Sequence, residues 1–390
     1  MKSIMYKKRN NMNNGIEKTA LEKYIKAYDD FEKIKTNNAQ HVIEIFSEDW
    51  INIRDKDDGL STYGIALIIL SDAYSKSKIN EEQTNKLNAI IKEFCMGNKF
   101  PNQDGIKKIL YYNLGICWQK IDNENKAIKA FKKYIYYQIK QSKNYNLPST
   151  AYAFRKCNTH LYQSLINNHL NLSSPTTFND PFDCPILELL NNEEGIPALI
   201  RTAYKDCLKI ACFIQPQQDL DKAKGEKDVL NNRLMWSHYA DSHKGICIKY
   251  NLKNYDINSI NKNNTVAYFK NVEYPSSKKI KKKIKDKINF YDAFFIKGKE
   301  WKYENELRLL YFNTNGKEEH KSIPISKCIE AIYFGLKCSS KDILAIKNLI
   351  ADKNIKIYKM KADKKNFGHL EAEEILTKKK SKQTKSTSKV

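Results

Sequence analysis

Apolar positions along the chain change their spacing near residue 145. Between residues 16 and 145, apolar side chains recur at steps of three and four residues, as at Leu21, Tyr24 and Tyr28, which places them on one face of a helix. After residue 150 the pattern changes to short β-branched and aromatic runs bounded by turn formers, which is typical of strands alternating with helices. The spacing therefore predicts an α+β fold class, with an all-helical N-terminal domain followed by a mixed α/β domain.

Residues 106–138 carry the most specific helical pattern. Their large and small residues fall where a tetratricopeptide repeat places them: Tyr111, Leu114, Gly115, Trp118, Ala127, Phe131 and Tyr134. Gly115 and Ala127 stand where two antiparallel helices must approach closely, and Phe131 helps to fill the seam between them. The segment resembles one such repeat, which implies a module that binds a protein partner. An unrelated helical hairpin is the alternative, because a stable stack needs three or more repeats.

Polar segments set the expected domain limits. Residues 140–149 are polar and hold Pro148, which is typical of a linker. The two ends of the chain are basic and lack an apolar pattern, which is typical of disorder. We therefore expect a disordered N-terminus (1–15), a helical tetratricopeptide-like domain (16–145), an α/β domain (150–372) and a basic disordered tail (373–390).

The second domain reads as short elements joined by polar turns. We expect strands at 152–155, 170–173, 210–214, 245–250, 266–274, 304–312, 328–335 and 355–360, helices at 161–168, 276–295 and 340–351, and a polar connection at 215–228. The loop at 174–183 is rich in turn formers and also holds Phe178 and Phe182. We expect both rings to be buried, and Asn179, Asp180 and Asp183 to organise the turn through bonds to the backbone.

Composition and charge bear mainly on partners. The chain has 390 residues, 41% of them hydrophobic, and a formal net charge of +23. Almost all the positive charge is lysine, and arginine, the usual residue for bidentate recognition of bases and phosphates, is scarce. Nucleic acid therefore stays an alternative partner, bound through the basic tail and the lysines between Lys278 and Lys287. We favour an amphipathic helix with a solvated lysine face for that segment, because lysine is abundant along the whole chain.

The cysteines and the apolar runs bear on the compartment. Nine cysteines are scattered without a CxxC pair, so the spacing predicts neither a disulfide framework nor a metal site, and reduced thiols fit a cytoplasmic protein. The first residues lack the apolar core of a signal peptide. No apolar run is long enough to cross a bilayer. We expect a cytoplasmic protein without a membrane partner.

Residues 234–250 hold the densest group of polar and aromatic side chains. Trp236, Ser237, His238 and Tyr239 are adjacent, and the segment runs directly into the strand-like run at 245–250. This is the arrangement of a site carried on the edge of a rigid scaffold.

Residues 301–312 hold a second candidate. Strand alternation places Glu304, Glu306 and Arg308 on one face, opposite the apolar face. Two neighbouring carboxylates repel each other unless cations compensate them. Arg308 serves one of them, and we expect Arg155 or residues 236–243 to serve the other. The pattern predicts that Arg155, Tyr239 and Glu306 converge on one pocket, with Trp236 or His238 on its wall.

Several blocks together resemble one known family. They are Phe154-Arg155 with residues 171–183, Cys212-Phe213, residues 234–250, residues 297–312 and residues 329–335. In this order they resemble the domain-of-unknown-function 2971 family over about residues 150–370. The family name carries no reaction.

The layout is also similar to the three-part signature of ADP-ribosyltransferase-like domains. This resemblance implies that Arg155 contacts the ribose or phosphate of NAD, that Ser237 or Tyr239 holds the nicotinamide side, and that Glu304 or Glu306 stabilises an oxocarbenium-like transition state. It departs from the family pattern at Arg155, where histidine is frequent. Further candidate contacts to NAD are Trp236, His238 and Arg308. NAD would be a substrate, with no cofactor bound permanently.

Three hypotheses follow for the whole chain. The leading one is a bacterial-type effector in which a helical partner-binding module is joined to an NAD-using transferase or glycohydrolase, in phage defence or toxin activity. The second is a non-catalytic nucleic-acid-binding protein. The third is a structural interaction protein in which the charged residues form a buried ion network that only specifies the fold.

Overall fold

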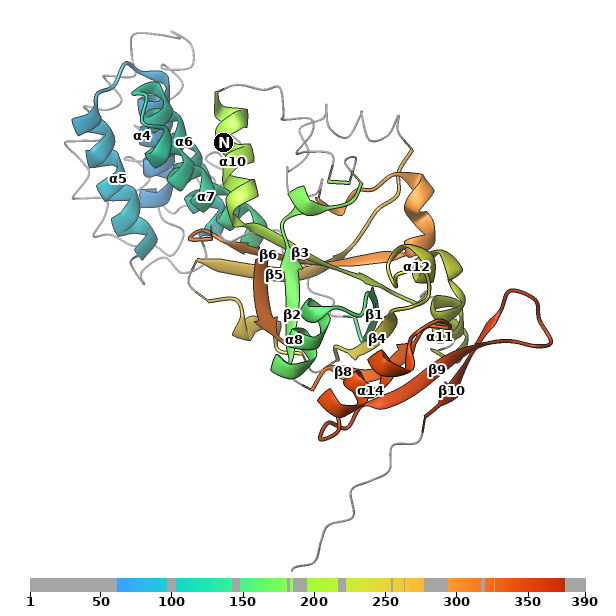
Figure 1. Cartoon of the computed structure of the whole chain (residues 1–390). Coiled ribbons are helices and arrows are strands. Elements are labelled where there is room, and N and C mark those ends of the chain that lie inside the picture. Colours follow the sequence, from blue (N-terminus) through green and yellow to red (C-terminus); the bar gives the residue numbers. More distant parts are fainter. Residues whose placement is uncertain are drawn as a thin grey trace, which may run out of the picture.

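The computed structural model describes residues 62–96, 103–141, 148–180, 183–184, 195–216, 222–253, 255–262, 264–276, 294–316, 320–325 and 327–375. Figure 1 shows the helices of the N-terminal part at one end of the molecule and a twisted sheet with its own helices beside them. Residues 277–293 of the expected helix, Phe182, the linker residues 142–147, the N-terminus expected to be disordered (1–15) and residues 376–390 of the basic tail expected at 373–390 lie outside these residues.

The N-terminal part is built from four described helices. They are α4 (Thr62–Lys76), α5 (Glu81–Met96), α6 (Asp104–Lys120) and α7 (Glu124–Gln141). The described residues before Thr150 contain no strand, as the spacing predicts. Gly115 lets α6 and α7 approach, because a Cβ there would lie 2.6 Å from Cε1 of Phe131. Ala127 and Phe131 are fully buried at this seam.

A mixed sheet of ten strands forms the C-terminal part. The strands are β1 (Thr150–Arg155), β2 (His169–Ser173), β3 (Leu208–Ile214), β4 (Ile246–Asn251), β5 (Thr265–Asn271), β6 (Glu306–Asn313), β7 (His320–Pro324), β8 (Ile329–Phe334), β9 (Lys356–Ala362) and β10 (Leu370–Glu374). Their order is β10-β9-β8-β4-β1-β3-β2-β7, with β6 pairing β3 and β5. Among the strands that the structure describes, β8 and β9 alone are parallel neighbours.

The sheet is divided along one edge of β3. On its other edge β3 pairs with β6 along its whole length, from Leu208 to Ile214. On the divided edge, β1 meets β3 only at Ile214 through Tyr152, and β2 meets it only at Ile210. The backbone of β3 between these two points therefore faces a gap between β1 and β2.

Helices cover both faces of the sheet. They are α8 (Thr159–Asn167), α10 (Ile196–Cys207), α11 (Lys222–Asn231), α12 (Arg233–His238) and α14 (Ser340–Leu349). α8 and α14 share a core with the sheet, α11 and α12 with another part of it, and α10 packs beside α7 (Figure 1). One core runs from α4–α7 through α10 to β3, β5 and β6, so the helical part is packed directly on the sheet.

Several elements differ from the pattern-based expectation. The polar connection at 215–228 includes the start of α11, and α10, β7 and β10 were not expected. The strand expected from Glu304 begins only at Glu306, because Lys299–Glu304 forms a 3-10 helix that ends at Asn305 with a left-handed φ of 42°. β10 continues to Glu374, past residue 372, where we expected the domain to end.

Candidate functional site

A cavity of about 520 Å³ lies at the gap between β1 and β2. Its lining comes from β1, α8, β2, β3 and α12, from the loop after β2, and from the residues that lead into β6. This volume is in the range that holds small-molecule ligands. The predicted residues that line it are Arg155, His238, Tyr239, Glu304 and Glu306. Trp236, Ser237 and Arg308 are absent from its lining.

The polar and aromatic side chains of residues 234–250 point in different directions, because the segment runs from α12 through a turn into β4. Trp236 points into the core, where its indole donates to the Leu230 carbonyl at 2.7 Å and its ring meets the edge of Phe154. Trp236 therefore lies in the core and does not line the cavity. Its indole can be buried there because its N–H has a hydrogen-bond acceptor. Ser237 is exposed to solvent outside the cavity. Of the four adjacent candidates Trp236 to Tyr239, only His238 and Tyr239 line the cavity; Met235, Ile248 and Tyr250 of the segment line it as well.

Beneath the cavity lies a buried charged cluster, made of Asp183, Lys297, Glu304, Glu306 and Arg308. Arg308 is fully buried. Its Nη2 donates to both carboxylate oxygens of Asp183, at 2.7 and 2.8 Å, and its Nε donates to Oε1 of Glu306 at 2.7 Å. The Phe294 carbonyl takes a further guanidinium hydrogen. The protein itself therefore occupies the donors of Arg308, and Arg308 lies outside the cavity lining, so the geometry gives no support to its expected contact with NAD.

Lys297 is the second cation of the charged cluster. Its Nζ lies 2.6 Å from Oε2 of Glu304, 3.4 Å from Oε2 of Glu306 and 3.3 Å from Oδ2 of Asp183. Burial lowers the pKa of Lys297, but the three carboxylates outweigh burial and raise it, so the ammonium stays charged. Lys297 therefore supplies the positive charge that the two glutamates require and that we expected from Arg155 or from residues 236–243.

Glu304 reaches the cluster from a turn and not from the strand. It is the last residue of the 3-10 helix, and Asn305 separates it from β6. Its Oε1 accepts the Tyr239 hydroxyl at 2.6 Å, so α12 is tied to the cluster as well. We expected Glu304, Glu306 and Arg308 to lie on one face of a strand. Only Glu306 and Arg308 are in β6 and share a face of it. Three acidic groups face two cations, which leaves one acid in excess.

The two glutamates differ in acidity. Burial raises the pKa of Glu306, but Arg308 and Lys297 outweigh burial and lower it to about 2. Burial is also the largest influence on Glu304, and there it outweighs Lys297 and Tyr239, so the pKa of Glu304 lies above its ordinary value. Glu304 is therefore the carboxyl group better suited to accept and release a proton.

Arg155 stands at the more open side of the cavity. Its side chain is half-buried and donates to two carbonyls, Phe154 at 3.0 Å and Cys212 at 3.4 Å. No carboxylate of the described residues pairs with it, so Arg155 is not part of the buried ion network that the third hypothesis requires. Gly245 keeps β4 against this strand, because a Cβ there would lie 2.2 Å from the Arg155 carbonyl oxygen. The guanidinium is held in place by the backbone, and no carboxylate in the described part of the chain compensates its charge.

Pattern reasoning missed Asp183 and Lys297. We expected Asp183 to organise a turn through the backbone, but its carboxylate binds the Arg308 guanidinium instead. Phe178, the ring expected to be buried beside it, is half-buried with the guanidinium carbon of Arg308 5.4 Å above it. The signal for Lys297 was the charge balance: two glutamates and one arginine require another cation nearby.

Comparison with known proteins adds one match. Residues 235–309 match the family described as Protein of unknown function (DUF2971). The DUF2971 match runs from α12 to β6 and includes Tyr239, Lys297 and the two glutamates, so the resemblance expected for the C-terminal half is confirmed in this segment. The helices α4–α7 lie outside it, and their likeness to a tetratricopeptide repeat stays a prediction. Neither the curated proteins nor the solved structures that were searched contain a match.

None of the described helices combines the length and the apolar character that crossing a membrane requires.

Proposed function

We propose that the DUF2971 domain binds NAD in the cavity between β1 and β2 and cleaves its nicotinamide–ribose bond. The observation that carries the proposal is the division of charge along this cavity: a guanidinium at Arg155 without a carboxylate partner among the described residues, and a carboxyl group with a raised pKa at Glu304. A dinucleotide presents the matching groups, an anionic diphosphate and a ribosyl carbon that becomes positive as its bond breaks.

Each residue has a role that its contacts support. The Arg155 guanidinium pairs with the diphosphate by charge-assisted hydrogen bonds. The Glu304 carboxylate, oriented by Lys297 and Tyr239, lies near the ribose and stabilises the positive charge that develops there. His238 is exposed on the cavity wall and offers a ring surface. Glu306 keeps Lys297 and Arg308 in place.

The atoms of the reaction balance without a metal or redox partner. The C1′–N1 bond breaks and nicotinamide leaves as a neutral base with the bonding electrons. Water, or the nucleophile of a target protein, attacks C1′ and gives its proton to the Glu304 carboxylate. A carboxyl group with a raised pKa is suited to this base role.

The test measures nicotinamide release from NAD by the purified full chain. We expect Glu304→Gln to lower the rate by at least about 100-fold, as for loss of a group that stabilises transition-state charge. The matched control is Glu300→Gln, an exposed glutamate of the same 3-10 helix, which should keep the parent rate. Thermal melts of both variants separate lost chemistry from lost folding. A parent protein that neither binds nor cleaves NAD would leave the charged cluster as a purely structural ion network.

Partner binding, the effector role and nucleic-acid binding stay proposals. The helices α4–α7 are the part of the chain that would bind a protein partner, and a cytoplasmic effector in phage defence or toxin activity fits such a pairing by analogy. The nucleic-acid alternative depends on the lysines between Lys278 and Lys287 and on the tail, which lie outside the described residues. No described contact favours it over NAD.

A further inference from the structure

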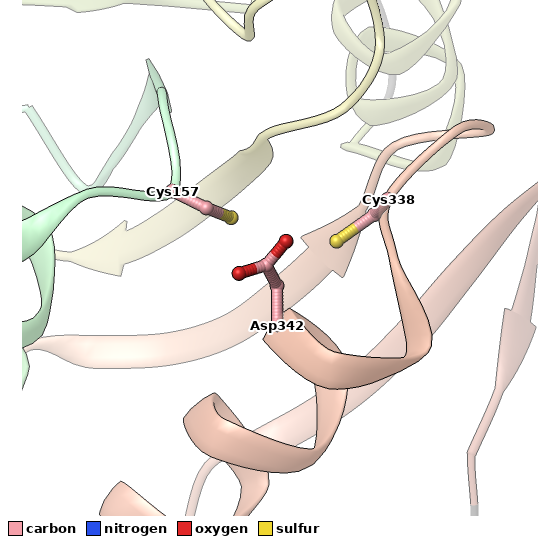
Figure 2. Close-up of side chains that lie close together, drawn as sticks. All are labelled: Cys157, Cys338 and Asp342. Atoms are coloured by element: carbon pink, nitrogen blue, oxygen red, sulfur yellow. The ribbon is translucent and has the colours of Figure 1, made fainter.

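Three side chains that can bind a metal ion meet at the start of two helices. Cys157 follows β1, Cys338 follows β8, and Asp342 lies in the first turn of α14. Their sulfur and carboxylate oxygen atoms all lie within 4.8 Å of one another, and Figure 2 shows the three side chains pointing toward a common space. We propose that Cys157, Cys338 and Asp342 bind one zinc ion, which ties the loop after β1 to the loop before α14.

The donor set suits zinc. Thiolate ligands select zinc and other soft or borderline ions, whereas calcium and magnesium take oxygen ligands only. Zinc bonds of about 2.3 Å to sulfur and 2.0–2.2 Å to oxygen put tetrahedral ligand atoms roughly 3.3–3.8 Å apart. The observed limit of 4.8 Å therefore needs only a small closure by side-chain rotation. Three protein ligands leave the fourth position for water.

Both cysteines precede the N-cap of a helix. Cys157 comes directly before Asn158, whose side chain accepts from the Leu161 amide and begins α8. Cys338 comes directly before Ser339, whose hydroxyl accepts from the Asp342 amide and begins α14. The positive ends of two helices are thus close to the two thiols. The capped start of each helix therefore fixes the backbone next to each thiol.

The carboxylate is already oriented. The Tyr162 hydroxyl donates to Oδ1 of Asp342 at 2.7 Å, and the Ser339 hydroxyl donates to Oδ2 at 2.6 Å. Each carboxylate oxygen keeps a second lone pair for a metal. Outer hydrogen bonds of this kind hold metal ligands in place in known sites. Cys157 and Asp342 are only partly buried, so an ion can reach the site from solvent.

A disulfide between Cys157 and Cys338 is the competing use of the two thiols. It would need an oxidant and would leave Asp342 without a role beyond capping α14. The carboxylate beside both sulfurs favours the metal. A thiol reagent distinguishes the two outcomes. Zinc protects both thiols until a chelator removes it, whereas a disulfide leaves no free thiol for the chelator to expose.

Metal analysis of the purified full chain tests the proposal. We expect about one zinc per chain, and a loss of that zinc in Cys157→Ser and in Cys338→Ser. The matched control is Cys95→Ser, a half-buried cysteine of α5, which should keep the zinc. Tyr162→Phe removes one outer hydrogen bond and should weaken zinc affinity by about 10–100-fold.

A second measurement on the unaltered protein covers variants that fail to fold. Cobalt added to the reduced, metal-free chain should give the sulfur-to-cobalt absorption and the visible bands of a tetrahedral site. Zinc should then remove those bands and protect two thiols from a thiol reagent until a chelator is added. Two results would overturn the proposal: zinc retained equally when both Cys157 and Cys338 are replaced, or a reduced parent chain that binds neither zinc nor cobalt. A Cys157–Cys338 disulfide that forms in air in a chain without metal affinity would assign the pair to redox chemistry instead.

Discussion

The two sides of the cavity use charge in opposite ways. On the buried side, every member of the charged cluster has a partner of opposite sign within the protein. On the open side, Arg155 is held by two carbonyls and has no described carboxylate beside it. A buried charge without a partner is costly, whereas a half-buried one is stabilised by water until a ligand replaces that water. The comparison indicates that Asp183, Glu306 and Arg308 stabilise the fold, whereas Arg155 makes no described ion pair that would do so.

The largest effect should follow from breaking the cluster at Arg308. Arg308→Met leaves Asp183 and Glu306 buried with only Lys297 between them, and we expect a loss of about 3–5 kcal/mol in the free energy of unfolding. Urea denaturation of parent and variant measures it. The exposed Arg233 supplies the control, because Arg233→Met should change stability by less than about 0.5 kcal/mol. Equal stability of the two variants would contradict the division of roles.

Arg155 should show the reverse behaviour. Arg155→Met removes a charge that has no carboxylate partner among the described residues, so the free energy of unfolding should change little. NAD affinity should fall by about 1.5–3 kcal/mol, the contribution of a hydrogen bond to a charged group, or roughly 10–150-fold in Kd. Calorimetric titration measures the affinity, with Arg233→Met again as control. A large loss of stability without a change in affinity would place Arg155 with the cluster.

The pH dependence of stability should report Glu306. Its pKa of about 2 lies below the ordinary value of 4.5, so the unfolded chain takes up this proton first as pH falls. Between pH 4.5 and 2, stability from Glu306 is lost at up to about 1.4 kcal/mol per pH unit. Glu306→Gln lacks this contribution, so the stability gap between parent and variant should narrow as pH falls through that window. A gap that is constant from pH 6 to pH 3 would contradict the lowered pKa.

The smallest effect is expected at Tyr239, which joins the two sides. Tyr239→Phe removes the hydrogen bond to Glu304, and water in the cavity can replace it, so stability should fall by about 0.5–1.5 kcal/mol. The hydroxyl lowers the pKa of Glu304, and its loss should raise that pKa further. The pH profile of NAD cleavage would then move to higher pH. A profile identical to that of the parent would exclude Glu304 as the titrating base.

Local patterns predicted the elements better than the contacts between them. The helices α6 and α7, their close approach at Gly115, and the strands β3, β4 and β8 follow from spacing, because each pattern is repeated along a single element. The 3-10 helix at Lys299–Glu304 does not follow, since its turn is set by the left-handed Asn305 and not by an apolar period.

Contacts between distant residues were beyond the reach of any local pattern. Asp183 and Arg308 are 125 residues apart, and the sequence near each says nothing of the other. Cys157 and Cys338 likewise meet only because β1 and β8 both pair with β4. Charge balance could have predicted that another cation was needed near the glutamates, but not that Lys297 would be that cation.

The junction of α10 and β3 connects the N-terminal helices directly to the wall of the cavity. α10 ends at Cys207 and β3 begins at Leu208, so no loop residue separates the helix from the strand. α10 packs along α7, and Lys132 of α7 forms an ion pair with Asp206 in its last turn, at 2.6 Å. β3 forms a wall of the cavity from Ile210 to Ile214. A displacement of α7 would therefore be passed through α10 and β3 to the wall of the cavity.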